Sequence, residues 1–153
     1  MPHTKPPKRS TADLQTSQFN AHGLVNIWQD GAIVYYEATG PFNAELVDLL
    51  AIAQRDFLAA AKPSGLWASI CTMHSSAMTS PEGIARYAAI LSVPKPASLT
   101  PVATAFVMGP EVEGYRIMSQ HYRNIFDNMG RPFQIFDTLE EAKAWVSGFL
   151  TPK

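Results

Sequence analysis

The chain has 153 residues and a mass of 16.8 kDa, a length at which one domain around one core is expected. Hydrophobic residues make up 46% of the chain and charged residues only 16%, which excludes wholesale disorder because enough apolar surface is present for a packed interior. The formal net charge of -1 provides no general attraction to nucleic acid or to an anionic membrane, so we expect neither as a partner.

The N-terminal part of the chain divides into a tail and a β-hairpin. Residues 1–22 hold three prolines and few large apolar side chains, which cannot offset the entropy lost on ordering, so we predict a flexible tail. The folded domain is then expected over residues 23–150. Residues 24–29 and 32–38 are rich in Val, Ile and Tyr and flank Asp30-Gly31, a dipeptide typical of two-residue turns. This pattern predicts a hairpin.

Helices and strands then alternate. Asn43 can cap a helix whose apolar residues recur at helical spacing up to about residue 62. Residues 66–71 form a short apolar run that predicts a buried strand. After a polar loop, Thr79 and Glu82 have the spacing of a capping box, which predicts a second helix that ends near residue 93.

The C-terminal third repeats the alternation. Residues 102–108 predict another buried strand, and a helix with one apolar face follows and stops at Gly130. Residues 133–136 predict the last strand, and Asp137-x-x-Glu140 predicts the start of the last helix. The order ββαβαβαβα predicts a single α/β domain with a mixed, mostly parallel five-stranded sheet, covered by about four helices.

Two segments carry a resemblance to a known family. They are residues 102–128 and residues 131–145, the second ending in Asp137-Thr-Leu-Glu-Glu-Ala-Lys-Ala-Trp145. With the order of elements, these segments resemble SpoIIAA-like proteins of the STAS-like superfamily, over residues 23–150. The resemblance implies a cytoplasmic domain that binds partner proteins, in some relatives under control of phosphorylation before the second helix. Ser75 or Ser76 would be the matching phosphoacceptor, although the Asp and Gly that flank it in those relatives are missing here.

Polar residues gather where a ligand is expected in an open α/β sheet, at the carboxyl ends of the strands. The loops at 71–80 and 109–113 should lie side by side there. The candidate ligand-binding residues, able to hold an anion against the second helix, are His74, Ser75, Ser76, Thr79, Ser80, Gly109 and Glu111. The alternative is that Thr79 or Ser80 caps the helix and the other hydroxyls meet water.

Catalytic, metal and cofactor patterns are weak or missing. His74 and Ser76 are only two residues apart, and their loop contains no Asp to orient the imidazole, so we do not predict an enzyme. Cys71 is the only cysteine and is expected to pack in the core. The four histidines include no pair at helical ligand spacing, and no glycine-rich nucleotide-binding motif occurs, so we expect no metal and no cofactor.

Two hypotheses for function follow. The first is a non-enzymatic regulatory domain that docks a protein partner or a second copy of itself, for which Arg116, Gln120 and Arg123 on one face of the third helix could form the interface. The more ordinary interpretation of those residues is a solvated flank of the helix. The alternative is a sensor or carrier of an apolar or anionic small molecule in the crevice described above. The lone cysteine and the lack of a signal peptide or membrane-spanning run predict a cytoplasmic location.

Overall fold

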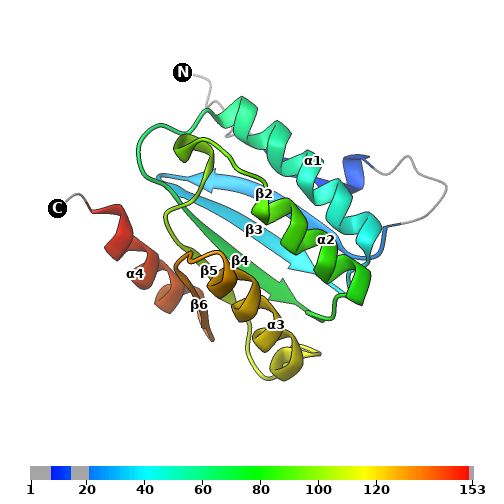
Figure 1. Ribbon diagram of the computed structural model, residues 1–153. Helices are drawn as coiled ribbons and strands as arrows, with labels where there is room; N and C mark the ends of the chain where they lie inside the picture. The colour runs from blue at the N-terminus through cyan, green and yellow to red at the C-terminus, as the bar shows by residue number, and fades with distance from the viewer. Residues whose placement is uncertain (1–7, 15–20, 152–153) are drawn as a thin grey trace, which may run out of the picture.

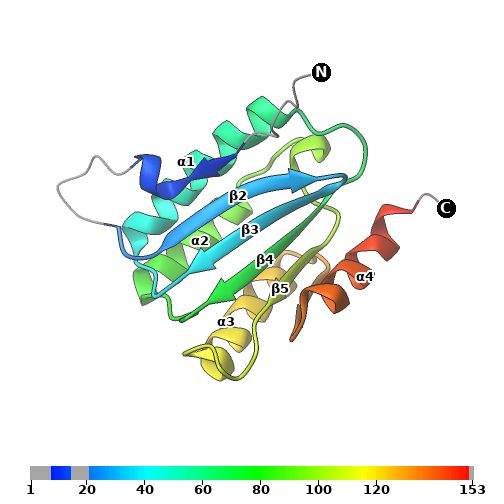
Figure 2. The same cartoon turned by 180° about the vertical axis from the view of Figure 1, so that it is seen from behind.

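The computed structural model describes residues 8–14 and 21–151, which form one twisted sheet with helices on both faces (Figures 1 and 2). The strands are β1 (Arg9–Ser10), β2 (Leu24–Asp30), β3 (Ile33–Thr39), β4 (Ala68–His74), β5 (Thr104–Val107) and β6 (Phe133–Phe136). The helices are α1 (Ala44–Ala61), α2 (Pro81–Ser92), α3 (Tyr115–Asn128) and α4 (Leu139–Leu150), with short 3-10 helices η1 (Thr11–Leu14) and η2 (Ala97–Leu99).

The strands lie in the sheet in their sequence order. β1, β2 and β3 pair antiparallel, and β3, β4, β5 and β6 pair parallel through helical crossovers. The prediction of a single α/β domain with a mixed, mostly parallel sheet and four helices is therefore confirmed for the described residues.

The predicted number of strands is wrong, because the sheet has six strands and not five. The extra strand, β1, lies in the segment expected to be a tail, where Arg9 pairs with Ile27 and Ser10 with Asn26. The next residue, Thr11, is 2% exposed and its hydroxyl accepts a hydrogen bond from the Val25 N–H at 3.1 Å. Backbone pairing thus orders a polar segment that has little apolar surface to bury. Residues 1–7 and 15–20 of the predicted tail lie outside the described residues.

Several element boundaries shift by one to three residues from those predicted. The hairpin turn consists of Gly31 and Ala32, because Asp30 still pairs with Ile33. β4 continues to His74, which stays in register with Thr39. The predicted capping residues Thr79 and Asp137 are wrong by one position. The caps are their successors, Ser80 and Thr138, whose hydroxyls accept from the Gly83 and Glu141 N–H groups at 3.0 and 3.2 Å.

The two faces of the sheet carry separate hydrophobic clusters, because successive side chains of a strand point to opposite faces. α1, α2 and α3 cover one face, and α4 alone packs on the other, over β4, β5 and β6 (Figures 1 and 2). None of the helices formed by the described residues is long and apolar enough to cross a membrane.

Candidate functional site

The two loops expected at the carboxyl ends of the strands do lie side by side. Ser76 and Glu113 form an isolated parallel bridge between the loop after β4 and the loop before α3. The Glu113 N–H donates to the Ser75 carbonyl at 3.0 Å, and the Ala77 N–H donates to the Glu113 carbonyl at 2.8 Å. The two loops are therefore joined by hydrogen bonds between their backbone N–H and C=O groups.

The polar side chains of this edge have structural partners. Ser76 is 4% exposed, and its hydroxyl donates to Glu113 Oε1 at 2.7 Å while it accepts from the Met78 N–H at 3.1 Å. Ser80 caps α2, and the Thr79 hydroxyl lies 2.8 Å from the Tyr122 hydroxyl. These hydroxyls hold the loop and the helix in place.

The remaining predicted ligand residues lie apart from a shared cavity. His74 and Ser75 are exposed, with His74 Nε2 3.7 Å from Glu37 Oε1 and Ser75 in the left-handed backbone region at φ 66. The Glu111 carboxylate folds against Gly109, where a Cβ atom would come within 2.5 Å of Glu111 Oε2. The structure brings Ser76 and Thr79 close to α3, but it does not gather all seven predicted residues around one space.

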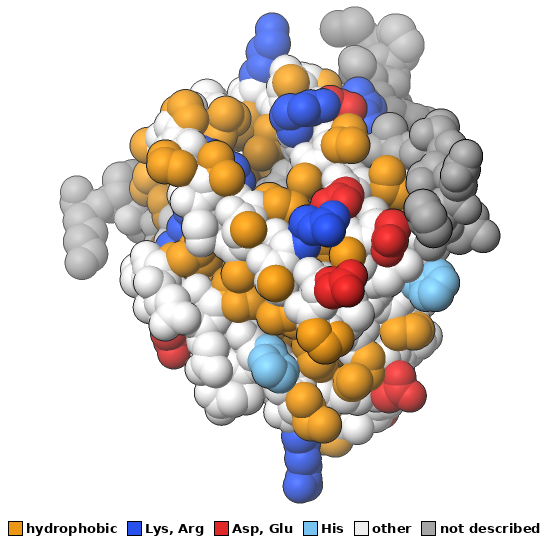
Figure 3. Space-filling view, turned by 45° about the vertical axis from the view of Figure 1, so that its right-hand side comes forward, with side chains coloured by type: hydrophobic (Ala, Val, Ile, Leu, Met, Phe, Trp, Pro, Cys, Tyr) orange, Lys and Arg blue, Asp and Glu red, His pale blue; other side chains and the backbone are white. Residues whose placement is uncertain are grey.

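The predicted interface residues Arg116, Gln120 and Arg123 are exposed on α3, and Gln120 donates to the Asn124 amide oxygen at 2.9 Å. Neither arginine takes part in the ion pairs found among the described residues. On the face drawn in Figure 3, acidic and basic side chains are interspersed with apolar ones and form no extended patch of one sign.

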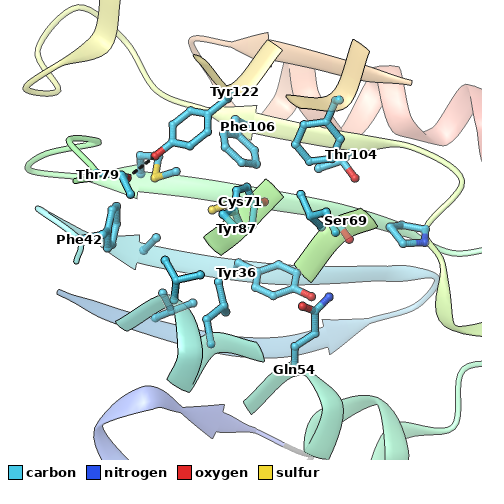
Figure 4. A pocket seen from close by; sticks show the side chains of 18 of the residues that line it. Tyr36, Phe42, Gln54, Ser69, Cys71, Thr79, Tyr87, Thr104, Phe106 and Tyr122 are labelled. Atoms are coloured by element: carbon cyan, nitrogen blue, oxygen red, sulfur yellow. Dashed lines mark hydrogen bonds between the residues drawn. The ribbon is translucent and has the colours of Figure 1, made fainter. Parts of the chain in front are cut away.

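A cavity of about 100 Å³ lies instead between the sheet and α1, α2 and α3 (Figure 4), and we call it the inter-layer cavity. A single buried water needs only roughly 10–15 Å³ of such space, so this volume can admit several waters or part of a small organic molecule. Alternate residues of β3, β4 and β5 form its floor: Tyr36, Ala38, Ser69, Cys71, Met73, Thr104 and Phe106. The helices supply its roof, including Leu46, Leu50 and Gln54 from α1, Tyr87 and Leu91 from α2, and Tyr122 and Phe126 from α3.

The cavity exists because α2 is held away from the sheet. Only Gly83 and Leu91 of α2 are buried, and the other apolar residues packed against the core, Ile84, Tyr87 and Ala88, are partly buried. Rigid rings fill the space beside it: Phe106 meets Tyr122 edge-on with centroids 5.0 Å apart, and Tyr87 meets Tyr122 at 6.3 Å. Aromatic rings cannot flatten into a thinner layer, so a gap stays beneath the helix.

The Tyr36 hydroxyl differs from the other polar groups of the cavity in its hydrogen bonding. It is fully buried and forms no hydrogen bond of good geometry with the described residues, while the residue as a whole is 8% exposed. Gln54 and Ser69 lie near it without completing such a bond (Figure 4). Burial raises the pKa of Tyr36 well above its ordinary value, so the phenol keeps its proton and acts as a donor.

Cys71 lies in the middle of the cavity floor (Figure 4). Burial among apolar side chains raises the pKa of its thiol to about 12. At neutral pH the sulfur is therefore protonated, which makes it a weak nucleophile. Cys71 packs between the layers as predicted, and the part of its surface that stays accessible faces the cavity.

One end of the cavity is closed by a satisfied polar network. The Tyr122 hydroxyl donates to the Ala77 carbonyl at 3.0 Å and lies 2.8 Å from the Thr79 hydroxyl. The neighbouring lining residues at this end, Phe42 and Met73, are apolar. This end corresponds to the carboxyl edge of the parallel strands.

The other end is a mouth formed by the connector between α2 and β5 and by Arg131, which lies two residues before β6. Trp67 Nε1 donates to the Ser98 carbonyl at 2.8 Å and fixes the connector. Lys95 is half-buried between the exposed Pro94 and Pro96, so its side chain turns inward. Burial lowers the pKa of Lys95, and the positive charge of Arg131 lowers it further. This mouth lies at the amino edge of the parallel strands, opposite to the edge that the sequence indicated.

Sequence reasoning missed the residues that give the cavity its polarity: Tyr36, Gln54, Ser69, Lys95 and Arg131. A signal for two of them existed. Gln54 continues the spacing of Leu46 and Leu50, and Ser69 interrupts an apolar run, so each places a polar group on a face that should be buried.

The fold and the cavity define an α/β domain with an internal pocket. Among residues 8–14 and 21–151, no cluster of three or more His, Cys, Asp or Glu side chains is arranged to hold a metal ion. Comparison of the chain with protein-family models, curated proteins and solved structures found no match.

Proposed function

We propose that this protein binds a small, largely apolar molecule in the inter-layer cavity. The observation that carries the proposal is the buried Tyr36 hydroxyl, which faces the cavity and forms no hydrogen bond of good geometry with the described residues, although Gln54 and Ser69 lie near it. Leaving a buried donor unsatisfied costs about 1–3 kcal/mol, and most buried polar groups in folded proteins are paired. A ligand with an acceptor near Tyr36 would remove that cost.

The chemistry of the lining supports binding and not turnover. Most lining residues are aliphatic or aromatic, which favours an apolar ligand body. The lining includes no His, Asp or Glu that could act as a general base, and the Cys71 thiol is protonated. A sensor or carrier therefore fits the site better than an enzyme.

The direct test is native mass spectrometry of the purified protein, followed by thermal-shift measurements against a panel of small apolar molecules. We expect either a stoichiometric adduct or a rise in Tm with at least one molecule. A Cys71→Leu variant, which fills the cavity floor, should lose the shift. Ala60→Leu, which adds the same group on the exposed side of α1, should keep it. Retention of binding by a folded Cys71→Leu variant would place the ligand elsewhere.

A second proposal is the protein-docking role implied by the resemblance to SpoIIAA-like proteins. The observed order of elements from β2 to α4 matches the order on which that resemblance rests, which supports a SpoIIAA-like architecture. For docking, the specific observation is on α3, where Ile117 is 62% exposed between Arg116 and Gln120. In this proposal the protein works in the cytoplasm on a protein partner or a second copy.

The docking role is tested by light scattering after size exclusion, with wild type and Ile117→Asp. A dimer that dissociates on this substitution would support self-association through α3. A wild-type monomer whose thermal stability responds to small molecules would direct the function to the cavity instead.

A further inference from the structure

We propose that the ligand of the inter-layer cavity is an amphipathic carboxylate, with its carboxylate in the mouth beside Lys95 and Arg131 and its apolar body directed toward Phe42 and Tyr122. The inference rests on the proposed small-molecule function and assigns to it a chemical class and an orientation.

Apart from the Thr79–Tyr122 pair, the hydroxyl and amide groups of the cavity gather in one half and can all donate. Figure 4 shows the polar atoms of Tyr36, Gln54 and Ser69 on the side away from the Thr79–Tyr122 pair. Tyr36 and Ser69 offer hydroxyl protons and Gln54 offers an amide NH₂ group. The groups in this half therefore match a ligand rich in acceptors.

The charged lining residues have one sign. Lys95 and Arg131 are both cationic, and the lining contains no acidic side chain. Neither residue takes part in the ion pairs of the described residues, and Arg131 Nη2 donates only to the Leu91 carbonyl, at 3.2 Å. Two cations that share a mouth without a counterion repel one another, and an anion placed between them would remove this repulsion.

Lys95 has the side-chain placement expected of a ligand-binding group. The residues on both sides of Lys95 are exposed, so its side chain could also have extended into solvent. Instead it is half-buried at the mouth. Withdrawing an ammonium group from water is unfavourable unless a partner is present. Arg131 adds a planar fork, which matches the geometry of a carboxylate.

The other half of the cavity fits the apolar body. Its polar groups, the Tyr122 and Thr79 hydroxyls, already bond to each other or to the Ala77 carbonyl and need nothing from a ligand. Phe42, Leu46 and Phe106 surround the remaining space. An apolar chain that enters from the mouth would meet only satisfied or apolar surface there.

The experiment uses saturated carboxylates from butanoate to decanoate, each paired with the alcohol of the same chain length, in calorimetric titrations of the full chain. The matched pairs keep the apolar body and change only the charge. We expect each carboxylate that binds to do so about tenfold more tightly than its alcohol, because hydrogen bonds to charged groups exceed neutral ones by roughly this factor.

Lys95→Met should remove most of this preference while leaving the affinity for the alcohol within about twofold, because only the charged contact is lost. Lys95→Arg, which keeps the charge, should retain the preference. Arg123→Met on the exposed face of α3 removes a cation far from the mouth and should bind as wild type does. Thermal unfolding of each variant verifies that it is folded.

The outcomes separate the two proposals. Equal affinity for alcohols and carboxylates, or a preference that survives in folded Lys95→Met, would overturn the anionic class and leave the small-molecule function standing. Failure of every alcohol and every carboxylate to bind, together with no response to any member of the apolar panel, would overturn both.

Discussion

The two faces of the sheet show how side-chain size decides whether a packed layer is closed or open. Beneath α4, the sheet presents small residues such as Ala68 and Ala105, and the facing helix residues Ala142 and Val146 are completely buried. Beneath α2, the sheet presents Tyr36 and Phe106, and Ile84, Tyr87 and Ala88 on the helix are only partly buried. Small side chains allow close helix–sheet contact, whereas stacked and edge-on rings hold a helix at a distance.

This difference separates a closely packed face from a face with a cavity within one domain. The α4 face contributes a closely packed hydrophobic cluster. On the opposite face, the Tyr36 hydroxyl lacks a good hydrogen bond, and Lys95 and Arg131 line the cavity without an acidic partner. Each of these features lowers the stability of the fold, and selection for stability alone would remove them.

The largest effect is expected from adding the same side chain to each face. Ala105→Leu inserts volume under α4, where Ala105 and the facing residues Ala142 and Val146 are completely buried, and should lower the free energy of unfolding by about 3 kcal/mol. Cys71→Leu on the neighbouring strand inserts volume into the cavity and should cost less than about 1 kcal/mol. Urea denaturation of both variants measures the contrast, and equal losses would contradict the difference between the faces.

A second contrast compares two tyrosines that share the cavity. Tyr122→Phe removes the hydrogen bonds of this hydroxyl to the Ala77 carbonyl and to the Thr79 hydroxyl, which then keep only their own bond at 3.3 Å. We expect a loss of about 1–2 kcal/mol in the free energy of unfolding. Denaturant titration measures this loss. A neutral Tyr122→Phe substitution would mean that the closed end of the cavity is not held by this network.

Tyr36→Phe should behave in the opposite way. It removes a hydroxyl that has no partner, so the ligand-free protein should be unchanged or up to about 1 kcal/mol more stable. The same substitution should weaken binding of an acceptor-bearing ligand severalfold. Thermal unfolding without ligand measures the change in stability, and titration with ligand measures the change in affinity. A destabilised ligand-free variant would show that the hydroxyl already has a partner.

The smallest effect on stability at neutral pH is expected from the ionisation of the Cys71 thiol. Its pKa of about 12, against an ordinary 9.0, means that both the folded and the unfolded chain carry a thiol at pH 7. As the pH rises above 9 the unfolded chain loses this proton first, so the contribution of Cys71 to stability falls between pH 9 and 12. Alkylation by iodoacetamide at pH 8 should be many-fold slower in the native protein than in urea, because burial raises the pKa of the native thiol and lowers its thiolate fraction. Similar rates would place the sulfur at the surface.

Much of the fold followed from the sequence because its signals are local. The 133–136 strand, the Asn43 cap and the left-handed Gly130 are as predicted, since a short run, a cap hydrogen bond and a positive φ each depend on a few neighbouring residues. β1 escaped prediction because its order comes from pairing with β2 and not from its own composition.

The sequence by itself therefore determined the α/β class, the alternation of elements and which face of each helix turns inward, because these depend on periodicities that each segment carries alone. Only the tertiary structure decided where the cavity lies and where it opens. The distance of α2 from the sheet depends on rings contributed by β5, α2 and α3 together. Lys95 and Arg131 lie at the same mouth because the chain returns from α3 to β6 there. Both arise from contacts between segments far apart in the chain, which no local pattern encodes.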